Sequence, residues 1–235
     1  MYKIPSSSME PTLIPGDYIL VNKMYYGARL LKFRKFYKEN KIEYLRTRGW
    51  SRIRCGDVFV FNWPNYGSLW SKSPNMFGDF IVKRCFGVPG DTIKIINKDA
   101  ERNAYIGSEN KSDIFPHDTT LNWKVDSFGP LFVPGIGKTI SLTHKNATIY
   151  KEVLMYEGFQ EMERNDSVFL NGQYTSTFTF KHNYYFMKGD NFYGSQDSRY
   201  WGFVPEENIV GKVIRVLFSN GEDGWMWDRV MKGIK

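Results

Sequence analysis

Eight short runs of β-branched and aromatic residues, each bounded by Gly, Pro, Asn or Asp, constrain the fold of this chain most strongly. Runs of this length and composition, separated by turn residues, are typical of strands. Helical periodicity is scarce by comparison. The pattern predicts an all-β or mostly β fold with few helices. The runs occupy residues 18–23, 57–63, 79–88, 92–96, 167–171, 176–180, 184–188 and 208–218.

Turn and cap signals locate some of the element boundaries. Asn171-Gly172 lies between two of the runs and predicts a tight hairpin. Residues 88–91, Val-Pro-Gly-Asp, predict another turn, because Pro presets φ and Gly can adopt a positive φ. One helix is predicted over residues 144–157, with Thr143 as its N-cap. A second helix is expected within residues 29–47, although its apolar stripe is less regular.

The chain has 235 residues, enough for one large domain or for a domain with a sizeable insertion. Residues 99–172 are more polar and richer in loop-forming residues than the segments on either side. We therefore expect a single region spanning residues 1–235, in which a β-rich subdomain at about 99–172 is inserted into a core. That core would consist of about residues 1–98 and 173–235.

The net charge of +7 comes from one stretch of the chain. Residues 29–54 hold ten basic and two acidic residues, and the rest of the chain has 22 basic and 23 acidic residues. Nucleic acid and anionic lipid are both possible partners for such a basic patch. A basic helix face that is simply solvated explains the same charge, so the pattern alone leaves the partner open.

Composition excludes several classes of protein and site. Hydrophobic residues make up 42% of the chain and aromatic residues 17%, which excludes a disordered chain. No run approaches 18 apolar residues, so the sequence predicts no membrane-spanning helix, and no cleavable targeting segment is recognisable. Two cysteines cannot supply a structural zinc site, and we predict no metal and no cofactor. Whether Cys55 and Cys85 form a disulfide is left open.

Lys83 interrupts the otherwise apolar run DFIVKRCFGV at residues 79–88. Alternate residues of a strand share a face, so Lys83 shares its face with Ile81 and Cys85. Burial disfavours the charged ammonium, so a lysine placed there can be neutral near physiological pH. A neutral amine can take the proton of a serine hydroxyl. In a Ser-His-Asp enzyme a histidine does this, and no histidine in a suitable context is apparent in this sequence. The alternative is a lysine on an edge strand that reaches out to solvent.

A second polar block, GDNFYGSQDSR, begins at Gly189. Asp197 and Arg199 are two residues apart and can form an ion pair that stiffens a loop beside a site. Ser195 offers a small hydroxyl that could orient an amine. The alternative is a turn-rich loop with an ion pair on the surface, which would contribute little to stability.

Four blocks in this order resemble bacterial type I signal peptidases, also called leader peptidases. They are IPSSSMEPTL at the start, GDYILVNKMYYG, VKRCFGVPGD and GDNFYGSQDSRYWGFVP. The resemblance extends over the whole chain apart from residues 99–172, and residues 128–142 with the Asn-Gly-Gln hairpin are similar to the branch found in Bacteroidetes. It implies a signal-peptidase-like antiparallel β-sheet or barrel core that carries the inserted subdomain.

The resemblance also assigns roles to residues. Ser8 aligns with the nucleophile and Lys83 with the general base of a Ser-Lys dyad. Ser6 aligns with the serine that helps to form the oxyanion hole, together with the Ser8 backbone N–H. Four residues of the last block align with supporting positions, namely Ser195 hydrogen-bonded to the lysine, Asp197 and Arg199 as an ion pair, and Asp190 in the Gly-Asp-Asn turn.

The implied function is removal of N-terminal signal peptides from secretory preproteins with small residues at −1 and −3, as in A-x-A sites. The implied place is the bacterial inner membrane, with the catalytic region on the periplasmic side. Members of the family carry a membrane anchor before the serine block, which is expected to be absent from this chain. In this context the basic residues 29–54 favour an anionic lipid surface as partner, and no nucleic acid is expected.

Two other readings explain part of the same sequence. A self-cleaving regulator could use the same Ser-Lys dyad, but no helix-turn-helix pattern precedes Ser8. A non-enzymatic basic β-barrel module could bind nucleic acid through residues 29–54, but it would leave the serine and lysine blocks without a role.

Overall fold

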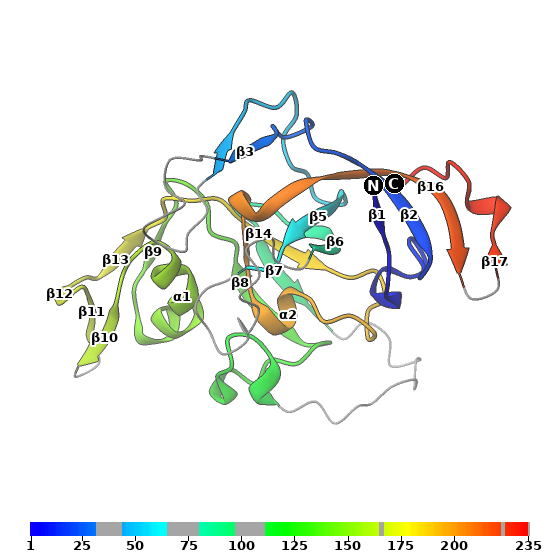
Figure 1. The fold of residues 1–235 in the computed structure, drawn as a ribbon. Helices are drawn as coiled ribbons and strands as arrows, with labels where there is room; N and C mark the ends of the chain where they lie inside the picture. Colours follow the sequence, from blue (N-terminus) through cyan, green and yellow to red (C-terminus); the bar gives the residue numbers. More distant parts are fainter. Residues whose placement is uncertain (32–43, 65–79, 97–110, 165–166, 222–223, 235) are drawn as a thin grey trace.

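The computed structural model describes residues 1–31, 44–64, 80–96, 111–164, 167–221 and 224–234. Its largest sheet is antiparallel and has the strand order β1-β2-β16-β5-β6-β14-β15, with β17 paired to β16 (Figure 1). These strands are β1 (Tyr2–Lys3), β2 (Asp17–Asn22), β5 (Val58–Asn62), β6 (Phe80–Gly87), β14 (Tyr184–Lys188), β15 (Val204–Pro205), β16 (Ile209–Gly221) and β17 (Gly224–Trp225). The mostly β, antiparallel fold predicted from the sequence is confirmed.

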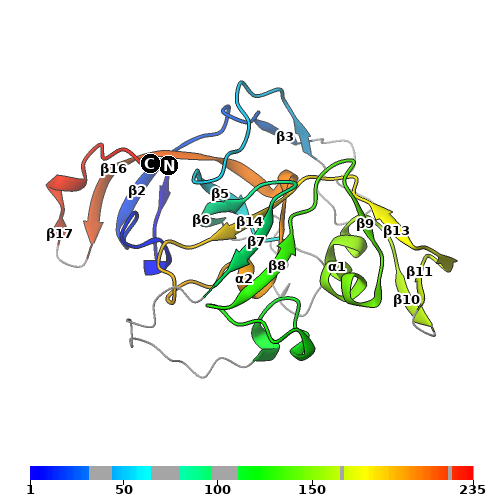
Figure 2. The ribbon, with the colours of Figure 1, turned by 180° about the vertical axis from the view of Figure 1, so that it is seen from behind.

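Four smaller antiparallel sheets complete the described β structure. They consist of β3 (Arg29–Leu31) with β4 (Tyr44–Arg46), β7 (Thr92–Ile95) with β8 (Phe128–Phe132), β9 (Thr139–Ser141) with β13 (Thr177–Thr179), and β10 (Glu161–Arg164) with β11 (Ser167–Leu170) and β12 (Gln173–Tyr174). The two α-helices of the described residues are α1 (His144–Tyr156) and α2 (Ser198–Trp201). In both views β10–β13 and β17 lie at opposite ends of the molecule, and the two termini lie side by side (Figures 1 and 2).

Short 3-10 helices connect several of these elements. The described ones are η1 (Ser7–Met9), η3 (Lys111–Asp113), η4 (Thr119–Leu121), η5 (Glu206–Asn208) and η6 (Trp227–Arg229). Of these, η1 contains Ser7 and Ser8 of the serine cluster Ser6-Ser7-Ser8, and it contacts β6.

The local signals predicted most boundaries correctly. Each of the eight runs forms a strand, within a few residues of its expected ends. Asn171 and Gly172 have φ values of 51° and 79° and join β11 to β12, as a tight hairpin requires. The predicted helix is α1, and the Thr143 hydroxyl accepts a hydrogen bond from Asn146 N at 3.2 Å.

The second helix expected within residues 29–47 is wrong at both described ends. Arg29 and Arg46 are opposite each other in the β3–β4 pair, and residues 32–43 lie outside the described residues. The Arg46 guanidinium donates to the carbonyl oxygens of Glu206 and Ile209, at 2.9 and 2.7 Å. These long-range bonds tie the basic segment to the end of the main sheet, and local helical periodicity gives no sign of them.

Three apolar clusters fill the interior. One lies under η1 and includes Met9, Leu13 and Val213, so the turn that carries the serines is anchored in the main sheet. Another includes Cys85 of β6 and Met187 of β14. The third spans residues 93–203 and combines α1 with side chains of β7, β8 and β14. The described residues of segment 99–172 therefore share an apolar core with β14 of the main sheet. That this segment is a separate inserted subdomain stays a prediction.

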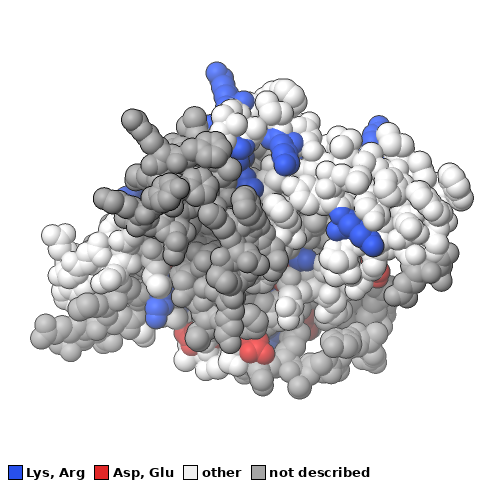
Figure 3. All heavy atoms as spheres, viewed as in Figure 1, with Lys and Arg blue, Asp and Glu red and all other residues white. Residues whose placement is uncertain are grey.

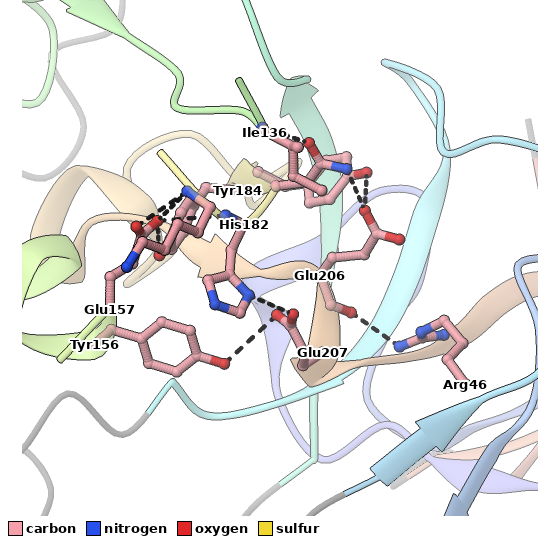
Figure 4. Close-up of polar contacts among 11 residues, drawn as sticks. Arg46, Ile136, Tyr156, Glu157, His182, Tyr184, Glu206 and Glu207 are labelled. Carbon is pink, nitrogen blue, oxygen red and sulfur yellow. Dashed lines mark hydrogen bonds and ion pairs between the residues drawn. The ribbon is translucent and has the colours of Figure 1, made fainter. Parts of the chain in front are cut away.

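A polar clamp joins the end of α1 to β14 and η5 (Figure 4). The Glu157 carboxylate accepts hydrogen bonds from Lys181 N at 3.0 Å and from the hydroxyl of Tyr184 at 3.1 Å. The Glu207 carboxylate is 2.7 Å from His182 Nδ1 and accepts a hydrogen bond from the hydroxyl of Tyr156. These contacts fix α1 against the beginning of β14.

Cys55 is exposed and Cys85 is buried, and both are free thiols. In the part of the chain that the structure describes, no helix has the length and apolar character needed to cross a bilayer.

Candidate active site

Two residues of the serine cluster, Ser7 and Ser8, lie in the 3-10 turn η1, and Ser6 precedes it as the N-cap residue. At the end of η1, Glu10 N donates to Ser7 O at 3.0 Å, and Leu13 N donates to Met9 O at 2.9 Å. Met9 is 1% exposed and Leu13 is fully buried, whereas Ser8 is partly exposed. The turn is thus held by its apolar side chains and presents the Ser8 hydroxyl at the surface of the sheet.

Lys83 meets this hydroxyl from β6. Its Nζ donates a hydrogen bond to Ser8 Oγ at 2.6 Å, although the two residues are 75 positions apart. Since β6 lies between β5 and β14, the edge-strand alternative for Lys83 is wrong. The residue is only 5% exposed, as its apolar neighbours in the sequence suggested.

The environment of Lys83 favours the neutral amine. Desolvation by burial is the largest influence and lowers the pKa of Lys83 from 10.5 to about 8. The charge of Asp197 raises this pKa, that of Arg199 lowers it, and that of Asp190 raises it. Because burial outweighs the carboxylates, about a tenth of the amine is neutral at pH 7 and half of it near pH 8.

Ser6 lies beside the nucleophile candidate. Its Oγ is 3.5 Å from Ser8 Oγ, and its backbone is extended, with φ −133° and ψ 160°. The Ser6 hydroxyl, which was predicted to help form the oxyanion hole, therefore lies next to the Ser8 hydroxyl.

Asp190 is bound by an arginine to which sequence reasoning assigned no role. Arg84 Nε and Nη2 donate to the two carboxylate oxygens of Asp190, each at 2.7 Å, which is a bidentate ion pair. Arg84 Nη2 also donates to Thr12 Oγ1 at 3.2 Å, and Nη1 donates to Gly56 O. Arg84 therefore joins the loop after Ser8 to the loop after β14, and its position next to Lys83 was the only sign of this role.

Asp197 and Arg199 form the ion pair that was expected, and it is completely buried. Both side chains are 0% exposed, and Arg199 Nε and Nη2 donate to the Asp197 carboxylate, each at 2.8 Å. Asp197 Oδ2 also accepts from Gly189 N at 2.9 Å, and Arg199 Nη2 donates to Phe192 O at 2.6 Å. The alternative of a surface ion pair is wrong, because this pair forms the interior of the 189–199 loop.

Ser195 lies at the site but does not make the bond expected of it. Its Oγ is buried and has no hydrogen-bond partner among the described residues, so the expected bond to Lys83 is not formed. Gly189 is in close contact here, because a methyl group on its Cα would overlap both Ser195 Oγ and Ser8 O. This crowding requires glycine at position 189, which sequence reasoning did not recognise.

Asn191 is another residue at the site without an assigned role. Its backbone N donates to Ser8 O at 3.2 Å, and its side-chain Nδ2 donates to Ser7 O at 3.3 Å. The sequence placed it in the Gly-Asp-Asn block, but only the fold brings it to the serine turn.

Within the described ranges, no group of three or more His, Cys, Asp or Glu side chains could hold a metal ion. The chemistry that the described arrangement supports is nucleophilic. The Ser8 hydroxyl is hydrogen-bonded to a buried amine of lowered pKa, and the Ser6 hydroxyl lies next to it. This combination is suited to acyl transfer from a peptide or ester carbonyl.

Comparison with known proteins agrees with this chemistry. Residues 1–218 match the family described as "Signal peptidase, peptidase S26". The chain is 31% identical to signal peptidase I of Aquifex aeolicus over 93% of this chain and 75% of that protein. It is 30% identical to signal peptidase I of Buchnera aphidicola subsp. Baizongia pistaciae over 91% of this chain, and 32% identical to that of Pseudomonas fluorescens over 93%.

The matched region spans 67% of the Buchnera protein and 64% of the Pseudomonas protein. These matches confirm the family predicted from the four sequence blocks and do not favour a self-cleaving regulator or a nucleic-acid-binding module. The chain belongs to the peptidase S26 family of signal peptidases and is a serine endopeptidase of signal-peptide processing.

Proposed function

We propose that this chain cleaves signal peptides from secretory preproteins by acyl transfer, with Ser8 as nucleophile and Lys83 as general base. One observation carries the proposal, namely the 2.6 Å contact between Lys83 Nζ and Ser8 Oγ at a lysine that is 5% exposed. Only a neutral amine can accept the serine proton, and burial makes the neutral form available near pH 8.

The reaction takes place in two balanced halves. Lys83 accepts the Ser8 proton while Oγ attacks the carbonyl carbon of the scissile bond, and the tetrahedral intermediate then expels the amine. The ammonium of Lys83 gives its proton to that amine, and the signal peptide is left as an ester on Ser8. Lys83 next takes a proton from water, whose oxygen attacks the ester, and returns this proton to Ser8 Oγ.

The supporting residues hold the reacting groups in place. The Ser6 hydroxyl and the Ser8 N–H are proposed to donate to the oxyanion of the tetrahedral intermediate. Ser195 is proposed to orient the Lys83 amine during proton transfer. The Asp197–Arg199 pair, together with Asp190, fixes the loop from which Ser195 projects.

The substrate class follows from the resemblance stated for the sequence. We propose that the cleavage site carries small residues at −1 and −3, as in A-x-A, and that larger side chains are rejected by their size. We place the enzyme at the bacterial inner membrane, with this region on the periplasmic side.

The proposed lipid contact is the basic segment 29–54, of which only part is described. Figure 3 shows described Lys and Arg side chains mainly in the upper part of one face, where β3 lies in Figure 1. Arg48, Arg52 and Arg54 are exposed, and Trp50 is 71% exposed. Arg46, by contrast, donates hydrogen bonds to backbone carbonyls of the fold. The segment therefore contains an arginine that supports the fold and three that are exposed to solvent.

Charge reversal tests this contact. Arg48→Glu, Arg52→Glu and Arg54→Glu together should weaken binding to vesicles with anionic lipid by at least about 100-fold, since each basic residue near such a surface contributes about 1 kcal/mol. Binding to vesicles of zwitterionic lipid should change little. The control reverses three exposed lysines elsewhere, Lys94, Lys124 and Lys138. Equal binding by the wild type and the arginine variant would refute this contact surface.

Cleavage of a preprotein in detergent micelles tests the reaction. Ser8→Ala and Lys83→Ala should each reduce kcat/KM by more than about 10³-fold, because each removes a partner that acts only as part of the pair. Ser7→Ala is the matched control, since the mechanism does not use the Ser7 side chain. Full activity of Lys83→Ala would show that the general base is a different group.

A further inference from the structure

Two hydrogen bonds join Asn191 to the turn that carries the proposed nucleophile. Asn191 donates from its backbone N to Ser8 O at 3.2 Å and from Nδ2 to Ser7 O at 3.3 Å. Its Oδ1 accepts from Gly194 N at 3.1 Å. The side-chain nitrogen therefore bonds to the serine turn, and the side-chain oxygen bonds to the residue's own loop.

The neighbours of Asn191 determine which way its side-chain amide points. At one end lies Ser7 O, which can only accept a hydrogen bond, and at the other lies Gly194 N, which can only donate one. Only one of the two amide orientations satisfies both. A methyl group on Gly194 would overlap this amide, so glycine at 194 allows the backbone to approach.

The bond to Ser7 O has a consequence for the next residue. The carbonyl of Ser7 and the N–H of Ser8 belong to one planar trans peptide group, so fixing the direction of one fixes the other. The Asn191 backbone bond holds the following peptide group through Ser8 O. The two peptide groups that flank the Ser8 Cα are therefore both fastened to the same residue.

We infer that Asn191 is a positioning residue that orients the Ser8 N–H toward the oxyanion of the tetrahedral intermediate. The inference rests on the proposed function, because it concerns the donor that the mechanism uses. The hydrogen bonds described for Asn191 go to Ser7, Ser8 and Gly194 and not to Lys83. Lys83 is held by β6, and Ser8 is held by the apolar anchors of η1. Loss of the Asn191 side chain should impair transition-state stabilisation and leave proton abstraction in place.

This division of roles predicts a specific kinetic pattern. Asn191→Ala should lower kcat about 10- to 100-fold, somewhat less than complete removal of an oxyanion donor does. KM should stay within about threefold, and the midpoint of the pH profile of kcat/KM should stay at the wild-type value. Asn191→Asp keeps the acceptor for Gly194 N and turns an oxygen toward Ser7 O, so it should lose at least as much kcat on the pH plateau.

A second readout separates positioning from general loosening. A peptide aldehyde with Ala at −1 and −3 adds the Ser8 Oγ–H across its carbonyl, and the resulting oxygen occupies the oxyanion position. Its inhibition constant should weaken in Asn191→Ala by the same factor as kcat/KM, because it resembles the transition state. Binding of a non-cleavable peptide of the same sequence should stay within about threefold. Gln196→Ala, an exposed position in the same loop, is the control and should match the wild type in every assay.

The outcomes decide between distinct alternatives. A kcat near the wild-type value in Asn191→Ala, equal weakening of the aldehyde and the non-cleavable peptide, or a shifted pH midpoint would each overturn the inference. Thermal unfolding of both variants within about 3 °C of the wild type is expected, and a variant that does not fold would assign Asn191 a structural role instead. If the wild type itself fails to cleave, the proposed function fails and this inference fails with it, whereas an active wild type with unaffected variants overturns only the role of Asn191.

Discussion

At the scale of single residues, the burial of Lys83 decides what the site can do. The pKa of its amine is about 8 in the folded protein and 10.5 in the absence of burial. Two carboxylates, those of Asp197 and Asp190, act in the opposite direction but do not reverse the effect. The unfavourable desolvation of the ammonium in the folded state makes the neutral amine available near pH 8.

The same shift predicts that a variant without the Lys83 amine is more stable than the wild type. Between pH 8 and 10.5 the unfolded chain binds more protons at Lys83 than the folded protein does, so the free energy of unfolding rises with pH in this range. Below pH 8 the amine is charged in both states, and burying it lowers the free energy of unfolding. Lys83→Met should therefore be more stable than the wild type at pH 7, by up to roughly 3 kcal/mol. The difference should shrink as the pH rises toward 10.

Urea unfolding of both proteins at pH 7 and at pH 9.5 measures this difference. Lys94→Met, at an exposed lysine, serves as the control and should show no comparable gain. A Lys83→Met protein less stable than the wild type at pH 7 would mean that burial of this amine is not costly.

Gly189 gives a steric prediction at the same scale. A methyl group there would overlap Ser195 Oγ and Ser8 O, and the backbone N–H of Gly189 is bound to Asp197. Gly189→Ala should displace the serine turn and reduce kcat by about 100-fold or more, since small displacements of reacting groups are costly. A kcat of Gly189→Ala close to the wild-type value would show that the serine turn does not fit tightly against Gly189 at the end of β14.

The sequence predicted that Ser8 and Lys83 would meet, and they do, but it did not predict the residues that hold them. Lys83 is recognisable because a charged residue in an apolar strand is unusual, and Ser8 because of the serine cluster. Arg84 and Asn191 are ordinary polar residues whose roles depend on which distant loop they meet. The expected bond from Ser195 to Lys83 is absent among the described contacts, because hydroxyl direction depends on packing that a motif does not specify.

At the scale of elements, the strands could be predicted and the basic segment could not. Alternating burial and turn residues such as Asn171-Gly172 are local, so each predicted run became a strand. Within residues 29–47, the outcome depends on Arg46 reaching carbonyls near β16, which are more than 150 positions away in sequence. Tertiary hydrogen bonds of this kind override weak helical periodicity.

The loop from Gly189 to Arg199 depends on its buried ion pair. Asp197→Ala leaves the Arg199 guanidinium buried without its partner, which should cost about 3–5 kcal/mol of unfolding free energy and abolish cleavage. The double variant Asp197→Ala with Arg199→Met should recover part of this stability, because no unpaired charge remains. Denaturant unfolding measures both, and a single variant within about 1 kcal/mol of the wild type would mean that water reaches this pair.

At the scale of the whole molecule, one apolar cluster connects the segment expected to be an insertion with the main sheet. Val153 of α1 and Phe186 of β14 belong to the same cluster, and the polar clamp of Figure 4 reinforces this contact. A change in composition at about residue 99 could suggest an insertion but could not show how much core it shares with the rest.

The clamp predicts a defined loss of stability. Glu157→Ala removes the acceptor of Lys181 N and of the buried Tyr184 hydroxyl, which should lower the unfolding free energy by about 1–3 kcal/mol. Lys151→Ala, at an exposed position on α1, is the matched control. Thermal or urea unfolding of the two variants tests the clamp, and equal stability would show that water replaces the Glu157 carboxylate without cost.

The pH dependence of kcat/KM between pH 6 and 10 tests most directly whether a buried, neutral Lys83 performs the chemistry. This parameter reports the ionisation of the free enzyme, and the wild type should rise about tenfold per pH unit at low pH and reach half its maximum near pH 8. Lys83→Ala should show no cleavage activity whose pH profile has this midpoint. A profile that is flat from pH 6 to 9, or one with its midpoint near 10.5, would contradict a base whose proton affinity is lowered by burial.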